Sequence, residues 1–517
     1  MFKFYLSSTQ LFCLIFGLIA LLVAIITHQN KCYRLSLLAL CLSAFGIFSF
    51  AALLDPFINL WDERFHALVA KNMMDRPFKP MLYADPVVDM AYDRWDRYHV
   101  WLHKQPLFLW QITLSFTLFG ISEYALRLPS VLMGVGLVLV TYRCANLMLN
   151  REVAFLTAIL LLSSSYYISL ISGRQVLEHN DFAFLFYISL SLWAWLEYYY
   201  SGHKKWVYWI GIFAGGAILC KWLVGLLVYL AWGVSKLYDR KLHPKHYLDL
   251  IKALFITLLL AVPWQIYGFI YFPEVAKMVY RHNLLHFSTV LEGHNGSFWY
   301  HLYHVNRLYG LFALLLVVPS FTLFYQELKD RKLFTSLFTA VLVVYLFFSF
   351  ARTKMPSFTI VVSMIIFIAF AVLFNRILKK ISNYLNKPSI YKIAVTIFLM
   401  AWVVWEVDLE LLQNTHTTRR ADNYYTRGLT YNKDVFESLN LPSKTVLFNV
   451  YHHVEAMFYT PYVAYGFIPS EKQYKSLKHL KRPIALVQPL PDSLPEYLQN
   501  DTSILIIEEP LQMVKIK

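Results

Sequence analysis

Residues 356–374 read PSFTIVVSMIIFIAFAVLF, a stretch without a single charged side chain. A helix needs about 20 such residues to cross the apolar core of a bilayer. Comparable stretches recur from residue 5 to residue 408, and they decide the fold. We predict about twelve transmembrane helices, at 5–27, 35–54, 126–148, 153–171, 182–200, 206–220, 222–237, 250–270, 307–325, 333–350, 356–374 and 389–408. The division between the sixth and seventh segments, which are short, is the weakest.

The composition of the whole chain supports a membrane protein. Of its 517 residues, 58% are hydrophobic, 17% aromatic and only 15% charged, whereas soluble domains are about 45–50% apolar. The five cysteines lie in or beside predicted helices, so neither a disulfide framework nor a cysteine metal site is expected. The amino terminus carries only Lys3 before its apolar run and is expected to be a retained helix.

The loops between the predicted helices differ in charge, and this difference predicts an orientation. Short cytoplasmic loops are enriched in Lys and Arg. Alternate loops carry most of these residues, at 31–34, 143–151, 203–205, 236–245, 329–332 and 376–387. We therefore place these loops inside and the other loops outside, in the inner (plasma) membrane. The basic loops also account for much of the net charge of +15, so nucleic-acid binding is not expected.

The composition changes after about residue 414, where apolar runs become short and polar residues separate them. Three of these runs, at 444–450, 483–487 and 502–508, are typical of buried strands, and 470–480 is typical of a helix. We predict two domains, a membrane domain at 1–410 and a small extracytoplasmic α/β domain at 411–517. No glycine-rich phosphate loop accompanies the strands, so they are not expected to bind a nucleotide.

The predicted outer loops carry the candidate functional residues. Asp62 and Glu63 follow the second apolar stretch directly, where they could simply end a helix in water or serve chemistry at the membrane surface. The next segment, 64–105, is long for a connection and is expected to be functional or to form interfacial helices. It leads to Lys104, which could extend to the interface as an ordinary lysine or bind a lipid phosphate.

Several motifs in this order resemble those of the C-type glycosyltransferases, which use polyprenyl-phosphate sugars and include the lipid A aminoarabinose transferase and the protein O-mannosyltransferases. The motifs are Asp62-Glu63, HKQPL at 103–107, FGISEYALRLPS at 119–130, CKWLVGL at 220–226, VPW at 262–264, RHNL at 281–284, GH at 293–294 and ARTKMPS at 351–357. The resemblance covers nearly the whole membrane region. It implies an all-α polytopic bundle with a large first outer loop.

The resemblance also implies roles for individual residues. Asp62 is the expected catalytic base and Glu63 its support or an acceptor ligand. The donor phosphate is expected at Lys104, Arg281 and Lys354. The second acidic or acceptor region comprises Arg174, Glu178 and Asp181, and the choice between the two carboxylates stays open. Further possible substrate contacts are His282, Asn283, His294, Lys221 and Arg352.

The expected partners are a polyprenyl-phosphate-linked sugar donor, a lipid or protein acceptor, and membrane lipids. No cofactor and no metal are expected, because the histidines form no recognised metal-binding pattern. The sequence departs from the family in two ways. An extra apolar helix precedes Asp62, and the usual KPP reads Lys104-Gln105-Pro106.

A transporter or lipid flippase is the alternative interpretation of a polytopic chain with polar residues near its helix ends. Transporters tend to place ionisable groups at the membrane midplane and to show repeated halves. Here the charges lie mostly at one predicted face, and no repeat is seen. Lys221 would lie within the membrane if 206–220 and 222–237 were one broken helix. The sequence therefore favours a glycosyltransferase with its site facing the periplasm.

Overall fold

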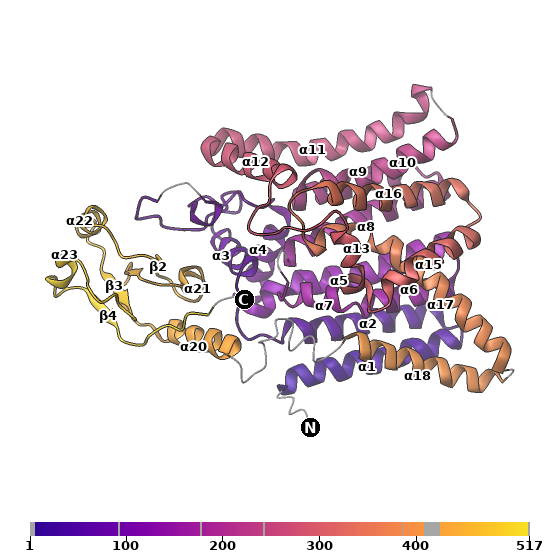
Figure 1. Cartoon of the computed structure of the whole chain (residues 1–517), viewed down its shortest axis with the longest axis horizontal. Coiled ribbons are helices and arrows are strands. Elements are labelled where there is room, and N and C mark those ends of the chain that lie inside the picture. The colour runs from indigo at the N-terminus through magenta and orange to yellow at the C-terminus, as the bar shows by residue number, and fades with distance from the viewer. Residues whose placement is uncertain are drawn as a thin grey trace. The chain divides into compact units, whose positions relative to one another are not determined.

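The computed structural model describes residues 6–90, 94–175, 178–240, 243–385, 387–407 and 424–514. Each of the twelve predicted apolar segments coincides with helical structure (Figure 1). The α-helices up to residue 407 are α1 (Ser8–Gln29), α2 (Tyr33–Ala52), α3 (Asp62–Asn72), α4 (Leu107–Phe119), α5 (Glu123–Met148), α6 (Arg151–Leu162), α7 (Ser165–Ile171), α8 (Glu178–Ser201), α9 (Lys205–Lys221), α10 (Leu227–Tyr238), α11 (Leu248–Tyr271), α12 (Pro273–Ser288), α13 (Tyr300–Tyr303), α14 (Val305–Tyr309), α15 (Ala313–Glu327), α16 (Arg331–Phe350), α17 (Ser363–Leu385) and α18 (Pro388–Val407). Short 3₁₀ helices are η1 (Trp95–Arg97), η2 (Trp222–Leu226), η3 (Pro244–Tyr247) and η4 (Pro356–Val362).

Eight of the described helical segments are long and apolar enough to cross a membrane, and the pair α6 and α7, bent by 53°, makes nine. The predicted number of twelve is not confirmed by this criterion. The helix α8 is not among the eight, α15 is shorter, and residues 205–238 count once. An all-α polytopic membrane bundle is nevertheless what the chain forms.

The chain reverses direction within residues 205–238. Trp222, which follows α9, has a φ of +60°. A Cβ atom placed on Gly225 would lie 2.8 Å from the backbone nitrogen of Ile218. Seven residues along a straight helix span about 10 Å, so only a reversal brings these two residues together. The predicted division between the sixth and seventh segments therefore corresponds to a real break.

Small residues let α1 and α2 pack closely. A Cβ on Gly46 would lie 2.7 Å from the Cα of Gly17, and a Cβ on Gly17 would lie 2.9 Å from the backbone nitrogen of Ile47. Two helices approach this closely only where both lack side chains. The glycines thus fix the first helical pair of the bundle.

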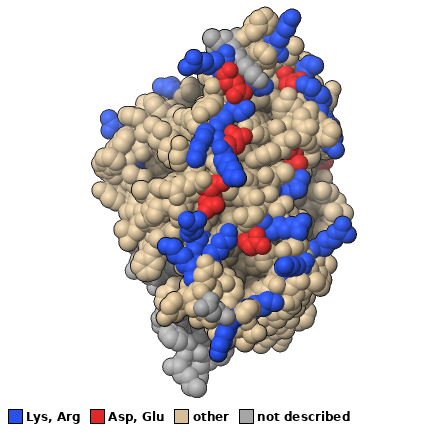
Figure 2. Space-filling model, turned by 90° about the vertical axis from the view of Figure 1, so that its right-hand side faces the viewer, with Lys and Arg blue, Asp and Glu red and all other residues tan. Residues whose placement is uncertain are grey.

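The predicted basic loops come together at one face of the bundle. Lys204 pairs with Asp249, and Lys332 pairs with Asp239 at 3.0 Å. Arg376 pairs with Glu327 at 3.0 Å. Figure 2 shows this face, on which lysine and arginine side chains gather with a few carboxylates between them. The alternation of charge along the sequence therefore corresponds to a spatial separation.

The carboxyl-terminal segment forms the predicted small α/β fold. A parallel sheet has the order β2-β1-β3-β4, with Val446 of β1 opposite Val463 of β2 and Ile484 of β3. Its elements are α20 (Tyr424–Ser438), β1 (Val446–Phe448), α21 (His453–Tyr459), β2 (Val463–Ala464), α22 (Glu471–His479), β3 (Ile484–Val487), α23 (Glu496–Gln499) and β4 (Leu505–Ile507). The three predicted strands and the helix after residue 470 are confirmed. The two-residue strand β2 was not predicted, because it is too short for a periodic pattern.

The described chain divides into two compact units. The first comprises Met1–Leu53, Lys104–Phe108 and Arg127–Leu412, and the second comprises Leu54–His103, Leu109–Leu126 and Gln413–Lys517. The second unit thus combines most of the first long loop with the carboxyl-terminal α/β segment. The predicted domain boundary at 410–411 lies outside the described residues and stays a prediction.

The glycine contact between α1 and α2 is testable. We expect Gly46→Val to lower the thermal stability of the purified protein, because its side chain would overlap Gly17 and overpacking costs about 1–3 kcal/mol. The measurement is the melting temperature in detergent. Gly233→Val on α10 is the matched control, because a Cβ there meets nothing within 4 Å. Equal melting temperatures for both variants would contradict this interpretation.

Candidate functional site

The acidic pair Asp62-Glu63 begins helix α3 in the second unit. Both side chains are buried, with exposures of 2% and 0%. Glu63 Oε2 accepts a 2.6 Å hydrogen bond from the backbone N–H of Asn59, whose side-chain amide donates to Asp55 Oδ2 at 3.3 Å. The positive end of a helix dipole stabilises such carboxylates in the first turn. The two carboxylates are therefore shielded from water, and Glu63 is fixed by a hydrogen bond, rather than exposed at a helix end.

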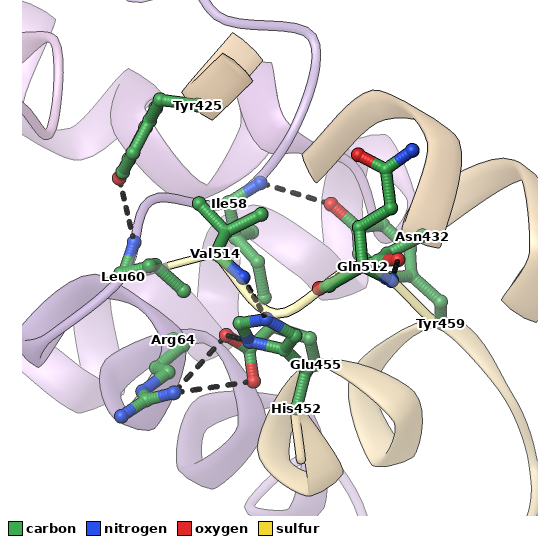
Figure 3. A network of polar contacts seen from close by, with 10 residues as sticks. All are labelled: Ile58, Leu60, Arg64, Tyr425, Asn432, His452, Glu455, Tyr459, Gln512 and Val514. Atoms are coloured by element: carbon green, nitrogen blue, oxygen red, sulfur yellow. Dashed lines mark hydrogen bonds and ion pairs between the residues drawn. The ribbon is translucent and has the colours of Figure 1, made fainter. Parts of the chain in front are cut away.

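The segment before this pair is fixed by two tyrosines from the carboxyl-terminal part of the same unit. Tyr459 accepts the backbone N–H of Ile58 at 2.9 Å, and Tyr425 accepts that of Leu60 at 3.3 Å (Figure 3). The next residue, Trp61, has a φ of +79°, a conformation that costs about 1–3 kcal/mol unless its surroundings impose it. The tyrosines supply part of that constraint.

A buried ionic chain fixes the first turn of α3. Arg64 Nη1 lies 3.1 Å from Glu455 Oε1, to which His452 Nδ1 donates at 3.2 Å (Figure 3). The backbone N–H of Val514 donates to His452 Nε2 at 3.3 Å, so the imidazole proton belongs on Nδ1. Burial alone would raise the pKa of Glu455, but the charge of Arg64 and the hydrogen bond from His452 hold it well below its ordinary value.

The other end of α3 is held by Lys71. Its Nζ donates to the carbonyl oxygens of Met457, Phe458 and Thr460 at 2.7–3.2 Å, at the end of α21. A cation at a helix carboxyl terminus is favourable because it meets unpaired carbonyls and the negative end of the dipole. Burial lowers the pKa of Lys71 to about 8. Both ends of the helix that carries Asp62 are therefore anchored to the carboxyl-terminal segment.

A second acidic group lies in the first unit. Asp181 of α8 pairs with Lys221 at the end of α9, and the Lys221 ammonium lies 4.7 Å from the centroid of the Phe358 ring. Asp181 and Arg174 are both buried. The structure thus brings together two predicted residues, Asp181 and Lys221. The side chain of Glu178 lies outside the described residues.

The predicted segment at 351–354 is hydrogen-bonded to the last turn of α12 and to the loop that follows it. The backbone N–H of Lys354 donates to the carbonyl of His294 at 3.0 Å, and that of Arg352 donates to the carbonyl of Phe287 at 3.0 Å. The Lys354 ammonium is buried and donates to the carbonyls of Phe348, Ser349 and Ala351. Lys354 therefore caps α16, and Arg352 is exposed beside it.

Positive charge gathers beside α12. Burial lowers the pKa of His286 to about 4, and the charges of Lys104 and Lys221 act in the same direction. Burial also lowers the pKa of His282, again with a contribution from Lys104. Lys104 and Lys221 are thus both within electrostatic range of α12, which also carries the exposed Arg281. His286 was not predicted, because a lone histidine on an amphipathic helix is no motif.

Two residues that were predicted to contact substrate have a buried side-chain nitrogen without a hydrogen-bond partner among the described residues. Asn283 Nδ2 and His294 Nε2 are buried without a hydrogen-bond partner in the described part of the chain. Buried polar atoms are normally bonded, so such exceptions call for an explanation, a ligand being one. Both positions fit the predicted substrate contacts.

The residues that sequence reasoning missed are mainly those that hold Asp62 and Glu63. Asp55 and Asn59 carried a weak signal, since both are polar and lie at the start of the same loop. Arg64 and Glu455 carried none, because 391 positions separate them. No spacing rule links residues that far apart.

Comparisons with known proteins agree with the motif resemblance. Residues 103–267 match the family model described as dolichyl-phosphate-mannose-protein mannosyltransferase. Two uncharacterized proteins of Aquifex aeolicus strain VF5 are 24% identical over 66% of this chain and 26% identical over 49% of it. The matched regions cover 62% and 55% of the lengths of those relatives.

Solved structures share the fold. ArnT from Cupriavidus metallidurans bound to undecaprenyl phosphate is 16% identical, with a TM-score of 0.63 over 88% of this chain and 86% of that one. The archaeal oligosaccharyltransferase AglB from Archaeoglobus fulgidus, in complex with an inhibitory peptide and a dolichol-phosphate, is 14% identical, with a TM-score of 0.52 over 84% and 64%. The predicted resemblance to C-type membrane glycosyltransferases is confirmed by the family segment together with this fold.

The Arg64–Glu455 pair generates a stability prediction. We expect Glu455→Gln to destabilise the protein toward the lower end of about 3–5 kcal/mol, because the variant leaves a largely buried arginine without its counter-charge. In the parent protein this stabilisation should be complete above the unfolded pKa of about 4.3 and be lost as the pH falls further, since the folded pKa is depressed.

Denaturation in detergent from pH 8 down to about pH 2 measures both effects, because the stabilisation is lost only below the unfolded pKa of about 4.3. Glu471→Gln is the control, because its pair with Lys475 is exposed and should leave stability unchanged. A parent protein and a Glu455→Gln variant with the same stability at pH 7 would show that the pair does not hold the unit together.

Proposed function

We propose that this chain is an integral membrane glycosyltransferase that moves a sugar from a polyprenyl-phosphate donor to a lipid A, envelope glycan or protein acceptor. The family segment at 103–267 supports glycosyl transfer, and ArnT, which shares the fold, was solved with undecaprenyl phosphate. The reaction would take place at the outer, periplasmic face of the inner membrane. Residues 411–517 would then form an extracytoplasmic domain.

The observation that carries this proposal is the group of cations beside α12. Lys104, at the start of the family segment, and Lys221 both act on the pKa of His286. A phosphate near Lys104 and Arg281 would be favoured by their positive charge, whereas Lys221 already has Asp181 as its partner. A phosphate attached to an apolar chain has the matching chemistry, since its charge would meet the lysines while its chain stays in the membrane.

The proposed roles follow from these surroundings. Lys104 and Arg281 would stabilise the phosphate as it leaves the sugar. Lys354 would act indirectly, because its ammonium already caps α16 and its backbone N–H bonds to the carbonyl of His294. His294, Asn283 and His282 would contact substrate, whereas Arg174, Asp181 and Glu178 would serve the acceptor region.

Asp62 would be the general base that takes the proton from the acceptor hydroxyl. A buried carboxylate at a helix amino terminus is held in one orientation, which a base needs in order to act on a defined hydroxyl. Glu63 would act as its support, because its own oxygen already accepts the Asn59 N–H.

A transporter or lipid flippase stays the second candidate, and one observation favours it. Broken helices with paired charges occur in transporters, and the α9 helix breaks at Lys221, which pairs with Asp181. Incubation of the purified protein with radiolabelled polyprenyl-phosphate sugar separates the two. An enzyme releases free polyprenyl phosphate, whereas a transporter moves the intact donor.

We expect Asp62→Asn to lower turnover by about 10² to 10⁴, the usual contribution of general base catalysis. Donor binding and the melting temperature should change little, because the amide has the size of the carboxylate. The measurement is release of polyprenyl phosphate under saturating donor. Asp89→Asn, an exposed carboxylate of the same loop, is the matched control. Full turnover by Asp62→Asn would remove this residue from the mechanism.

We expect Lys104→Ala to weaken binding of polyprenyl phosphate by about 1.5–3 kcal/mol, the value of a hydrogen bond to a charged group. Microscale thermophoresis with polyprenyl phosphate measures this without knowledge of the sugar. Lys277→Ala should bind normally, because Lys277 lies on α12 with Glu274 as its exposed partner. If Lys104→Ala and Lys277→Ala bind equally well, the donor phosphate does not bind at Lys104.

A further inference from the structure

A crevice runs along α18 between α6 and α17, within the first unit. It consists of three adjoining cavities. The first has a volume of about 420 Å³ and shares Leu156, Leu378 and Leu399 with a second, apolar cavity of only about 10 Å³. The second shares Leu160, Phe374 and Trp402 with a third, of about 160 Å³. The crevice thus follows α18 from its first turn to its last.

The length of this crevice matches an extended lipid chain. The helix α18 has 20 residues, which corresponds to about 30 Å, similar to the thickness of the hydrocarbon core of a bilayer. The middle of the crevice is lined entirely by Leu, Ile, Phe and Trp side chains. Such a lining offers nothing to a polar solute, and an acyl chain would lie against these apolar side chains and would have to displace some of them, because the space between them is only about 10 Å³.

The largest cavity differs from the rest because it is basic. Lys31, Lys387 and Lys392 line it against a single carboxylate, Glu152. Lys392 donates to the side chain of Asn30 at 3.0 Å. Lys31 and Lys387 are exposed, and neither forms an ion pair with any residue that the structure describes. This end of the crevice therefore has an excess of uncompensated positive charge.

Polar groups near these lysines suit a headgroup at the membrane boundary. Tyr33 and Tyr391 line the cavity, and tyrosines are typical of the interfacial zone. The His28 ring is stacked on Phe155 at 4.0 Å, and its Nδ1 is buried without a hydrogen-bond partner among the described residues. A buried ring nitrogen that faces a cavity can bond to a ligand.

We infer that this crevice binds an anionic glycerophospholipid, with its phosphate among Lys31, Lys387 and Lys392 and an acyl chain along α18. Basic pockets between transmembrane helices bind anionic headgroups in this way. The charge excess selects an anion, and the apolar continuation selects a lipid over a free phosphate. The site contains none of the residues proposed for sugar transfer, so a test of lipid binding here is independent of the proposed function.

Two sets of variants test the inference on the full-length protein. The charge set is Lys31→Gln, Lys387→Gln and Lys392→Gln combined, with the matched control Lys245→Gln, Lys329→Gln and Lys380→Gln at the same basic face. The chain set is Val395→Trp, which lies in the crevice, with the control Ile393→Trp, which is exposed on the same helix. Lys→Arg at the three positions should restore binding, because the charge returns.

Native mass spectrometry with added phosphatidylglycerol measures binding. We expect an affinity loss of at least tenfold for the charge set and for Val395→Trp, no loss for either control, and little binding of phosphatidylcholine to any variant. Equal binding by the charge set and its control would overturn the proposal. Binding of inorganic phosphate as tight as that of the lipid would also overturn it, because the acyl chain would then contribute nothing to the affinity.

The melting temperature gives an independent measurement if a variant folds poorly. Phosphatidylglycerol should raise the melting temperature of the parent protein more than phosphatidylcholine does, since a ligand that binds only the folded state stabilises it. An equal rise with both lipids would show that the basic cavity does not discriminate headgroup charge and would refute the inference.

Discussion

The low dielectric of the membrane constrains where this chain can place its charges. A charge within the hydrocarbon layer is costly unless it is paired or reaches an interface. Many lysines and arginines therefore collect at the helix ends of one face, where carboxylates of neighbouring loops pair with several of them. Lys221 follows the same rule in another way. It ends the α9 helix, where the chain reverses, and pairs with Asp181.

The same constraint explains why the acidic pair belongs to the second unit. Asp62 and Glu63 are almost fully buried, which would be prohibitive in lipid. Within a folded unit, backbone N–H groups and a helix dipole compensate them. That compensation depends on contacts from the carboxyl-terminal segment, including Tyr459 on the preceding loop and Glu455 on Arg64. Burial of the carboxylates and docking of that segment are thus two parts of one arrangement.

The sequence predicted helices well and contacts poorly, for a physical reason. Apolar runs of about 20 residues have no alternative to a helix in a bilayer, and the short strands near 446, 484 and 505 were also recognisable from their composition. The contact partners of individual side chains could not be predicted in the same way. The family resemblance implied that Lys354 binds the donor phosphate, and nothing in the sequence indicated that its ammonium would also donate to the carbonyls that end α16. Only the folded backbone decides whether a cation faces a ligand or a carbonyl.

The family match covers only part of the candidate site. Residues 103–267 contain Lys104, Arg174, Asp181 and Lys221 but neither the acidic pair nor any part of the α/β fold. Of the residues proposed to meet the donor, only Lys104 lies in the shared segment, and Arg174 and Asp181, which are proposed for the acceptor region, also lie in it. Asp62, Glu63 and the residues that hold them lie outside it. Since a base must be aligned with its acceptor hydroxyl, the carboxyl-terminal segment, which anchors α3 at both ends, fixes the position of Asp62 through contacts that the family model does not cover.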